Sequence, residues 1–155
     1  EPKMQLTTKG RYAVNALLDL ALHDDEGPVA LADIAKRQSI SQTYLEQLFS
    51  KLKRHGLVSS SRGPRGGYRL ALETDEISIA KIIYSVDEKI DITRCHGKQN
   101  CQKDQRCITH DLWMELNMHV SGFLNGITVF DLINRNNVRH VSQQQDFAYV
   151  QMHRS

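Results

Sequence analysis

The chain has 155 residues, of which 40% are hydrophobic and 25% charged, and its formal net charge at pH 7 is +2. These values are ordinary for a globular protein of one domain, or of one domain with an extension. No apolar run approaches the roughly 18 residues of a membrane helix, and the charged, polar opening predicts no signal peptide. We therefore expect a protein of the cytosol.

Charge is distributed unevenly along the chain. Residues 41–70 hold six basic side chains and one acidic one, a balance of +5, whereas residues 73–92 hold two lysines and six acids, a balance of −4. This separation indicates a basic face suited to phosphate groups. The alternative is a solvated surface on which the charges cluster by chance, and charge alone does not decide between the two.

The first third of the chain predicts three helices in succession. Thr8 is a candidate N-cap for a helix whose apolar residues follow the 3.6-residue period. A short periodic segment over 31–37 comes next, and Ser41 is the expected N-cap of a helix over about 42–54. Gly56 should end that helix, since glycine commonly lies just past the last turn.

The period then changes to that of a β-hairpin. Residues 57–62 predict a strand, 63–67 a turn and 68–70 the returning strand, with three glycines and a proline in the turn. Two helices with a tight break followed by a glycine-rich hairpin are the order of a winged helix-turn-helix, which binds DNA. A helical hairpin in an interaction domain is the alternative.

The second half of the chain predicts a helix around 78–86, a non-periodic stretch over 91–107, a long amphipathic helix from about 109 to 125, and a short helix capped by Thr128. The polar tail from Asn136 predicts disorder or partner-dependent order. The expected fold is mostly α with a small β-hairpin wing. We divide it into a winged helix-turn-helix domain (4–90), a cysteine loop (91–110), the long and short helices (109–134) and a polar tail (135–155).

The helix over 42–54 buries an apolar stripe and leaves short polar side chains on its opposite face. Basic residues near its far end suit phosphates, and arginines on the hairpin turn suit a narrow minor groove. Glu46 is unusual in this basic surface, because a carboxylate accepts from cytosine but repels phosphate. The candidate DNA contacts are Gln42, Thr43, Glu46, Gln47, Ser50, Lys51, Lys53, Arg54, Arg62 and Arg65.

Three cysteines, Cys95, Cys101 and Cys107, are separated from one another by five intervening residues, and two further residues separate Cys107 from His110. An odd number of cysteines in a polar loop argues for a metal or redox site rather than a disulfide framework. Three thiolates and an imidazole suit either tetrahedral zinc or a [2Fe-2S] cluster, and the wide, even spacing favours the cluster.

The fourth ligand of this site has alternatives in the same loop. His96 adjoins Cys95 and would strain a chelate, and Asp104 is a further candidate. His110 ranks first because it begins the long helix, where a rigid element can aim it. A histidine ligand also makes the site labile, since protons compete for it, and lability suits a sensor.

These motifs together resemble the iron–sulfur cluster regulator (IscR) type of winged-helix transcription factors. The resemblance covers about residues 4–134 and includes all four positions of the ligand set. The other matching stretches are 6–13, 41–49, 56–58, 62–64 with 66–68, 123–124 and 127–128.

The resemblance implies a homodimer joined by the long helix, with one [2Fe-2S] cluster per subunit. It further implies a repressor or activator of iron–sulfur assembly genes, acting at two classes of DNA site of which one needs the cluster. Base contacts would fall on Thr43, Glu46 and Gln47, with Arg62 in the minor groove. Thr43 departs from the serine familiar at this position in the family.

Two rival interpretations remain on these grounds. One is a zinc-stabilised regulator of the same fold that senses no cluster. The other is an iron–sulfur enzyme or electron carrier, which has little support because the sequence offers no catalytic constellation, nucleotide loop or substrate-binding motif. We therefore predict a DNA-binding regulator and not an enzyme.

Overall fold

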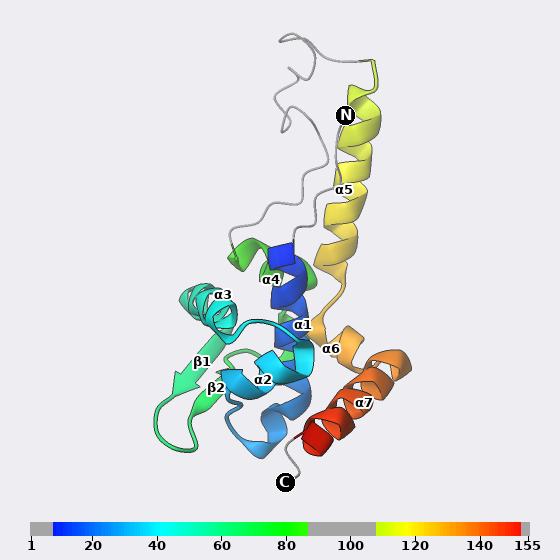
Figure 1. Ribbon diagram of the computed structural model, residues 1–155. Coiled ribbons are helices and arrows are strands. Elements are labelled where there is room, and N and C mark those ends of the chain that lie inside the picture. Colours follow the sequence, from blue (N-terminus) through cyan, green and yellow to red (C-terminus); the bar gives the residue numbers. More distant parts are fainter. Residues whose placement is uncertain (1–7, 87–107, 153–155) are drawn as a thin grey trace.

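The computed structural model of the protein describes residues 8–86 and 108–152. Helix α3 and the hairpin lie on one side of the body, α6 and α7 on the other, and α5 projects away from it (Figure 1). This arrangement confirms the predicted fold class, mostly α with a small hairpin. The elements are α1 (Thr8–His23), η1 (Asp24–Glu26), α2 (Leu31–Gln38), α3 (Gln42–Arg54), β1 (Val58–Ser61), β2 (Gly67–Leu70), η2 (Thr74–Glu76), α4 (Ile79–Ser85), α5 (His110–Gly126), α6 (Val129–Ile133) and α7 (Asn136–Met152).

The helix-turn-helix is formed by α2 and α3 and a junction of three residues. Ser39 adopts a left-handed conformation with φ 56°, which turns the chain sharply after α2. The Ser41 hydroxyl then accepts from the Tyr44 backbone N–H at 3.3 Å, as predicted for the N-cap of α3. Thr8 is itself the first residue of α1, where the sequence had predicted the cap.

Helix α3 ends at a glycine, as the sequence predicts. Gly56 has φ 79°, and its backbone N–H donates to the Lys53 carbonyl at 3.0 Å. The N–H of Leu57 donates to the Leu52 carbonyl, also at 3.0 Å. These two bonds form a Schellman motif, which satisfies carbonyls of the last turn and directs the chain into β1.

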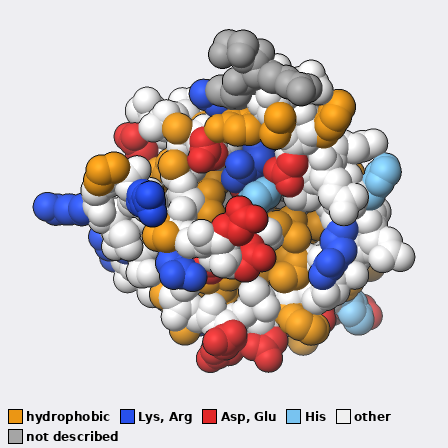
Figure 2. Space-filling model, turned by 90° about the horizontal axis from the view of Figure 1, so that it is seen from below, with side chains coloured by type: hydrophobic (Ala, Val, Ile, Leu, Met, Phe, Trp, Pro, Cys, Tyr) orange, Lys and Arg blue, Asp and Glu red, His pale blue; other side chains and the backbone are white. Residues whose placement is uncertain are grey.

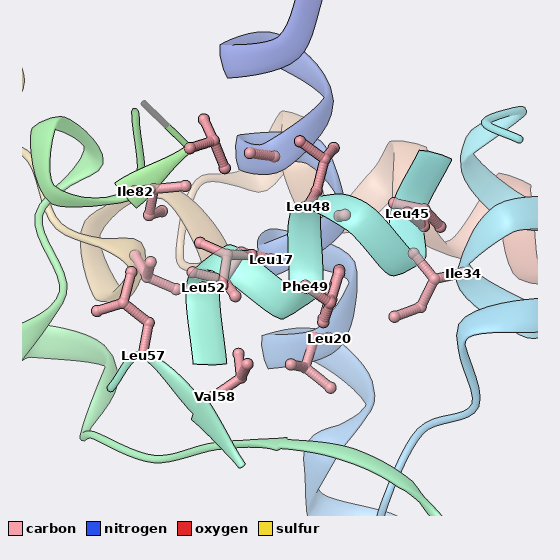
Figure 3. Packing of buried hydrophobic residues seen from close by; sticks show 14 of the residues in the cluster. Leu17, Leu20, Ile34, Leu45, Leu48, Phe49, Leu52, Leu57, Val58 and Ile82 are labelled. Atoms are coloured by element: carbon pink, nitrogen blue, oxygen red, sulfur yellow. The ribbon is translucent and has the colours of Figure 1, made fainter. Parts of the chain in front are cut away.

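The core lies between α1, α2, α3 and α4. In Figure 3, Leu17 and Leu20 of α1 meet Leu48 and Phe49 of α3, with Ile34 of α2 alongside. Burial of these apolar side chains stabilises the fold, at roughly 1.5–3 kcal/mol for each large side chain removed from water. The largest fully buried residues are Phe49, Leu17, Leu20, Ile34, Leu45, Leu48, Leu52, Leu57, Ile77, Ile82, Ile83 and Val86.

The hairpin is an antiparallel pair whose register runs from Val58 opposite Leu70 to Ser61 opposite Gly67. Strand β2 is also attached to the segment before α2, since Val29 and Tyr68 exchange backbone hydrogen bonds of 2.9 and 2.8 Å. A Cβ at Gly67 would lie 2.4 Å from the Val29 carbonyl oxygen. Only glycine allows this close approach, which holds the hairpin against the body.

Helix α5 is joined to the body at its C-terminal end. Ile79 donates its N–H to the Ile127 carbonyl, and Val129 donates to the Ile77 carbonyl, both at 2.9 Å. Thr128 caps α6 through a capping box with Asp131, which confirms the predicted cap. This pairing fixes the start of α6 against the segment that precedes α4.

The apolar stripe of α5 divides between two surroundings. Val120 and Leu124 pack against the core, whereas Leu112 and Phe123 are exposed, with fractional exposures of 55% and 64%. Met118 is exposed as well, at 72%. Part of the stripe therefore packs against the chain's own core, and the other part leaves an exposed apolar surface.

The prediction for the tail is wrong over Asn136–Met152, which form the helix α7 and contact α2. The polar side chains that suggested disorder have partners on α1 and α2, as described below. Among the described residues, no helix is both long and apolar enough to span a membrane.

Candidate functional site

The predicted DNA contacts of α3 come together on one exposed face. Gln42, Thr43, Glu46, Gln47, Ser50 and Arg54 are exposed, while the apolar stripe on the other side of the helix is buried. A shallow, open depression runs along this face. Its lining consists of Thr43, Glu46, Gln47, Ser50, Lys51 and Arg54.

Aromatic contacts hold α3 in place in its first turn and at its middle. The ring of Tyr44 packs edge-to-face against Tyr12 of α1, with centroids 5.7 Å apart. Phe49 packs in the same way against Tyr68 of β2, at 5.0 Å. Such pairs contribute about 0.5–1.5 kcal/mol beyond their buried area. They couple the exposed face of α3 to α1 and to the wing.

The wing presents Arg62 and Arg65 on its exposed turn. Lys53, a predicted phosphate contact, donates from its Nζ to the Ser60 hydroxyl at 2.7 Å, and this bond ties α3 to β1. Two charged groups that the sequence analysis did not single out also position the wing. The Arg69 Nε donates to the Asp24 carboxylate at 3.0 Å, and the Leu70 N–H donates to the same carboxylate at 3.3 Å.

Asp24 and Arg69 are separated by 45 residues, so no local spacing marks them as partners. The sequence signal nearest to them is the acidic run that ends in Gly27-Pro28, which predicts a turn and nothing more. Their pairing emerges only when β2 folds back beside η1.

The predicted metal ligands are only partly covered by the structure. Cys95, Cys101 and Cys107, with the alternatives His96 and Asp104, lie outside the described residues. His110 is the first residue of α5 and is 4% exposed, one of three buried polar residues in the described ranges. Within those same ranges no group of three or more histidine, cysteine or acidic side chains is placed to hold a metal ion.

Two hydrogen bonds join the first turn of α5 to the residue that precedes it. The Trp113 N–H donates to the Thr109 carbonyl at 3.2 Å, and its indole Nε1 donates to the Thr109 hydroxyl at 2.9 Å. A buried histidine at the start of a helix suits metal ligation, because burial shields the ligand from water and the helix positions its backbone. The donor set of three thiolates and one imidazole therefore fits an iron–sulfur cluster or zinc on chemical grounds.

A family model for Rrf2, described as an iron-dependent transcriptional regulator, matches residues 6–135. The HTH-type transcriptional regulator IscR of Aliivibrio salmonicida is 57% identical over 143 residues, which are 92% of this chain and 85% of that protein. The IscR of Photobacterium profundum is 56% identical over 143 residues, which are 92% of this chain and 83% of that protein.

Solved structures show the same likeness. T. potens IscR superposes with a TM-score of 0.69 and 39% identity, covering 83% of this chain and 85% of that one. CymR (YrzC), the global cysteine regulator of B. subtilis, superposes with a TM-score of 0.73 and 34% identity, covering 84% of this chain and 97% of that one.

Proposed function

This chain belongs to the Rrf2 family of iron-dependent transcriptional regulators, and on that premise we propose that it regulates iron–sulfur assembly genes in response to a bound [2Fe-2S] cluster. It is a DNA-binding transcription regulator and not an enzyme. The observation that carries the DNA-binding assignment is the open face of α3, where six of the predicted contact residues line one depression.

The proposed interface makes three kinds of contact with DNA. Thr43, Glu46 and Gln47 would meet base edges in the major groove, where short polar side chains discriminate between base pairs. Lys51 and Arg54 would bind phosphates, together with Gln42 and Ser50 on the same face. Arg62 and Arg65 of the wing would enter or flank the minor groove, whose negative potential is greatest where A·T tracts narrow it.

The proposed cluster ligands are Cys95, Cys101, Cys107 and His110. When bound, the cluster would report iron–sulfur supply through its occupancy. His110 supports the proposal because it is buried at the start of α5, so that occupancy is coupled to a helix rather than to a free loop. The division into a DNA-binding domain (4–90), a cluster loop (91–110) and a dimerisation unit (109–134) is part of this proposal.

A homodimer through α5 is the proposed assembly. Leu112 and Phe123 share one exposed apolar face on a helix that projects from the body, and a second copy of α5 would cover it (Figure 1). Two recognition helices would then meet half-sites about one turn, roughly 34 Å, apart or a multiple of that distance. Light scattering of the free protein that gives a monomer, with specific DNA binding retained, would contradict this assembly.

The ligand set is tested on anaerobically prepared full-length chain. We expect visible absorbance with iron and sulfide in equal amounts, whereas colourless protein with bound zinc supports the zinc-stabilised alternative. Alanine at any of the three cysteines should abolish cluster retention, and His110→Ala should weaken it. His119→Ala is the matched control, because His119 lies on the same helix with its side chain 75% exposed. Equal retention by both histidine variants would remove His110 from the ligand set.

The role of Glu46 is tested with duplexes selected by cluster-loaded and by cluster-free protein. We expect the Glu46 carboxylate to exclude one class of site from the cluster-free protein, with a cost of about 1–3 kcal/mol per unfavourable contact. Glu46→Ala should therefore let cluster-free protein bind sites that otherwise need the cluster. Equal loss of affinity at every site would instead make Glu46 an essential base contact or a structural residue.

A further inference from the structure

Helix α7 packs on the helix-turn-helix with a polar face. It lies against α2, on the side of the body away from α3 (Figure 1). None of its residues is buried, and its half-buried positions carry mainly polar side chains. Those positions are Val138, Ser142, Gln145, Asp146 and Tyr149. The attachment of α7 therefore depends on hydrogen bonds and charge more than on the hydrophobic effect.

These hydrogen bonds reach both ends of α2. Near its last turn, the side-chain amides of Gln38 and Gln145 bond to each other in both directions, at 2.9 and 3.3 Å. In its first turn, the Tyr149 hydroxyl donates to the Asp33 carboxylate at 2.5 Å. The Tyr149 ring also lies under the Arg37 guanidinium, 5.6 Å from its centroid. Helix α7 therefore contacts α2 in both its first and its last turn.

A buried ion pair continues the network from α2 into α1. Arg37 donates to Asp19 through two nitrogens, at 2.7 and 3.0 Å, and both side chains are at least nine-tenths buried. His23 links α1 to α7. Its Nδ1 donates to the Asp19 carbonyl at 2.7 Å, and its Nε2 lies 2.8 Å from the Asp146 carboxylate. Figure 2 shows acidic, basic and histidine side chains gathered near the middle of the lower face.

The packing between α7 and α1 is incomplete. A pocket of about 190 Å³ opens between the two helices, with Leu18 and Leu22 of α1 facing Val138 and Val141 of α7. A gap beside apolar side chains forfeits dispersion contacts that a packed interface would make. Because polar contacts are its main support, we expect the docking free energy of α7 to be small.

From this network we propose that α7 is a buttress that holds α2, and through it α3, in the DNA-binding arrangement. Gln145, Asp146 and Tyr149 are its positioning residues. The junction from α2 to α3 is only three residues long and is turned sharply at Ser39, so a change in the orientation of α2 displaces α3. The inference rests on the proposed DNA binding. It assigns a role in that binding to α7, a helix that does not itself contact DNA.

The test compares two double variants of the full-length chain. Asp146→Ala with Tyr149→Ala removes contacts on the docked face, and Gln143→Ala with Gln151→Ala alters two exposed positions of the same helix. Amide hydrogen exchange measures the protection of α2, and fluorescence anisotropy measures Kd for a duplex that the wild-type chain selects from a random pool. Tyr149→Phe is a milder variant that keeps the ring over Arg37.

We expect the docked-face variant to exchange the amides of α2 and α7 about tenfold faster than the wild type. Its Kd should rise about three- to tenfold, because affinity falls in proportion to the fraction of molecules in the competent arrangement. Tyr149→Phe should move both quantities in the same direction, with Kd up about twofold. The exposed-face variant should match the wild type in both.

Faster exchange in α2 with unchanged or tighter DNA binding overturns the proposal, since α7 is then either irrelevant to DNA binding or inhibitory. Unchanged exchange in the docked-face variant overturns it as well, because the contacts do not then support α2. If the wild-type chain selects no duplex, the proposed function itself fails. That outcome is recognisable because it does not involve any α7 variant.

Discussion

Helices α3 and α7 are both attached to the same body, but by opposite physical means. Helix α3 inserts Leu45, Leu48, Phe49 and Leu52, all at most 1% exposed, into the core. Helix α7 has no buried residue and is held by side chains that bond to α1 and α2. Apolar burial is strong and insensitive to direction, whereas hydrogen bonds are directional and bring a smaller net gain over water.

The difference separates the stability of the core, to which α3 contributes, from the docking of α7 on that core. Loss of an α3 contact should lower the stability of the whole domain, because the core is shared by every helix around it. Loss of an α7 contact should release one helix and leave the core intact. The following changes test this separation, beginning with the largest expected effect.

Phe49→Ala should lower the free energy of unfolding by about 4 kcal/mol, because it removes a fully buried ring and leaves a cavity. Phe147→Ala on α7 is the matched control, since its ring is 68% exposed and the change should stay within about 0.5 kcal/mol. Urea denaturation of both variants measures the difference. Similar losses in the two would show that α7 is as much a part of the core as α3.

Asp19→Asn should lower the free energy of unfolding by about 3 kcal/mol, because it leaves the Arg37 guanidinium buried without its carboxylate. Burial opposes ionisation of Asp19, but hydrogen bonds from His23, Arg37 and Gln38 outweigh it and hold its pKa below the ordinary value. Asp146→Asn, at the exposed edge of the same network, should cost about 1 kcal/mol or less. Equal effects in denaturation would mean that the network has no buried centre.

Stability should also fall at alkaline pH through His23. Its hydrogen bond to the Asp19 side chain, with further bonds to the Asp19 carbonyl and to Asp146, raises its pKa from 6.5 to about 9 against the opposing effect of burial. A pKa that is higher in the folded state gives stability that is complete below pH 6.5 and is lost as the pH rises through 9.

The loss should be about 1 kcal/mol, since solvent screens a partly exposed group. The groups that face His23 are Asp19 from α1, Arg37 from α2 and Asp146 from α7. Denaturation at pH 6.5 and 9.5 should show the difference in the wild type and not in His23→Gln. The exposed-histidine variant His119→Gln should keep the wild-type dependence, and a flat wild-type profile would contradict the prediction.

The smallest effect on stability is expected at the wing, which is attached to the body both by apolar packing and by polar contacts. Asp24→Asn weakens the ion pair with Arg69, a half-exposed contact whose loss should change stability by less than about 1 kcal/mol. It should weaken binding to duplexes with A·T-rich minor grooves about two- to threefold, because β2 is less firmly placed. Asp25→Asn, on the next and exposed residue, is the control. Equal binding by both variants would show that the Asp24–Arg69 ion pair does not help to position the wing.

The helix-turn-helix was predictable because its signals are local. Ser41, Gly56 and the period of the apolar residues each act within a few positions, and α3 and the hairpin follow within one or two residues of the predicted bounds. The exposed face of α3 follows in turn, since a helix that buries one stripe must expose the other. The positions that line its depression were therefore identified from the sequence.

The tail could not be predicted in this way. Residues 136–152 lack a clear apolar stripe, and polar composition alone indicates disorder. Their helix packs on α2 through Gln145 and Tyr149, which bond to Gln38 and Asp33, 107 and 116 positions away in the chain. Periodicity reports on burial of apolar groups and carries no information about such pairing.

By itself the sequence determined the order of helices and hairpin and the exposed face of α3, because helix periods, caps and turn residues act over short distances. Its motifs also carried the resemblance to the family to which the chain belongs. Only the tertiary structure decided that the apolar stripe of α5 divides between core and surface. It also decided that Lys53 braces the wing and that Asp19, Arg37 and Asp146 join three helices. These contacts depend on which surfaces meet once the core has formed, and charged side chains take the partners that this packing brings within reach.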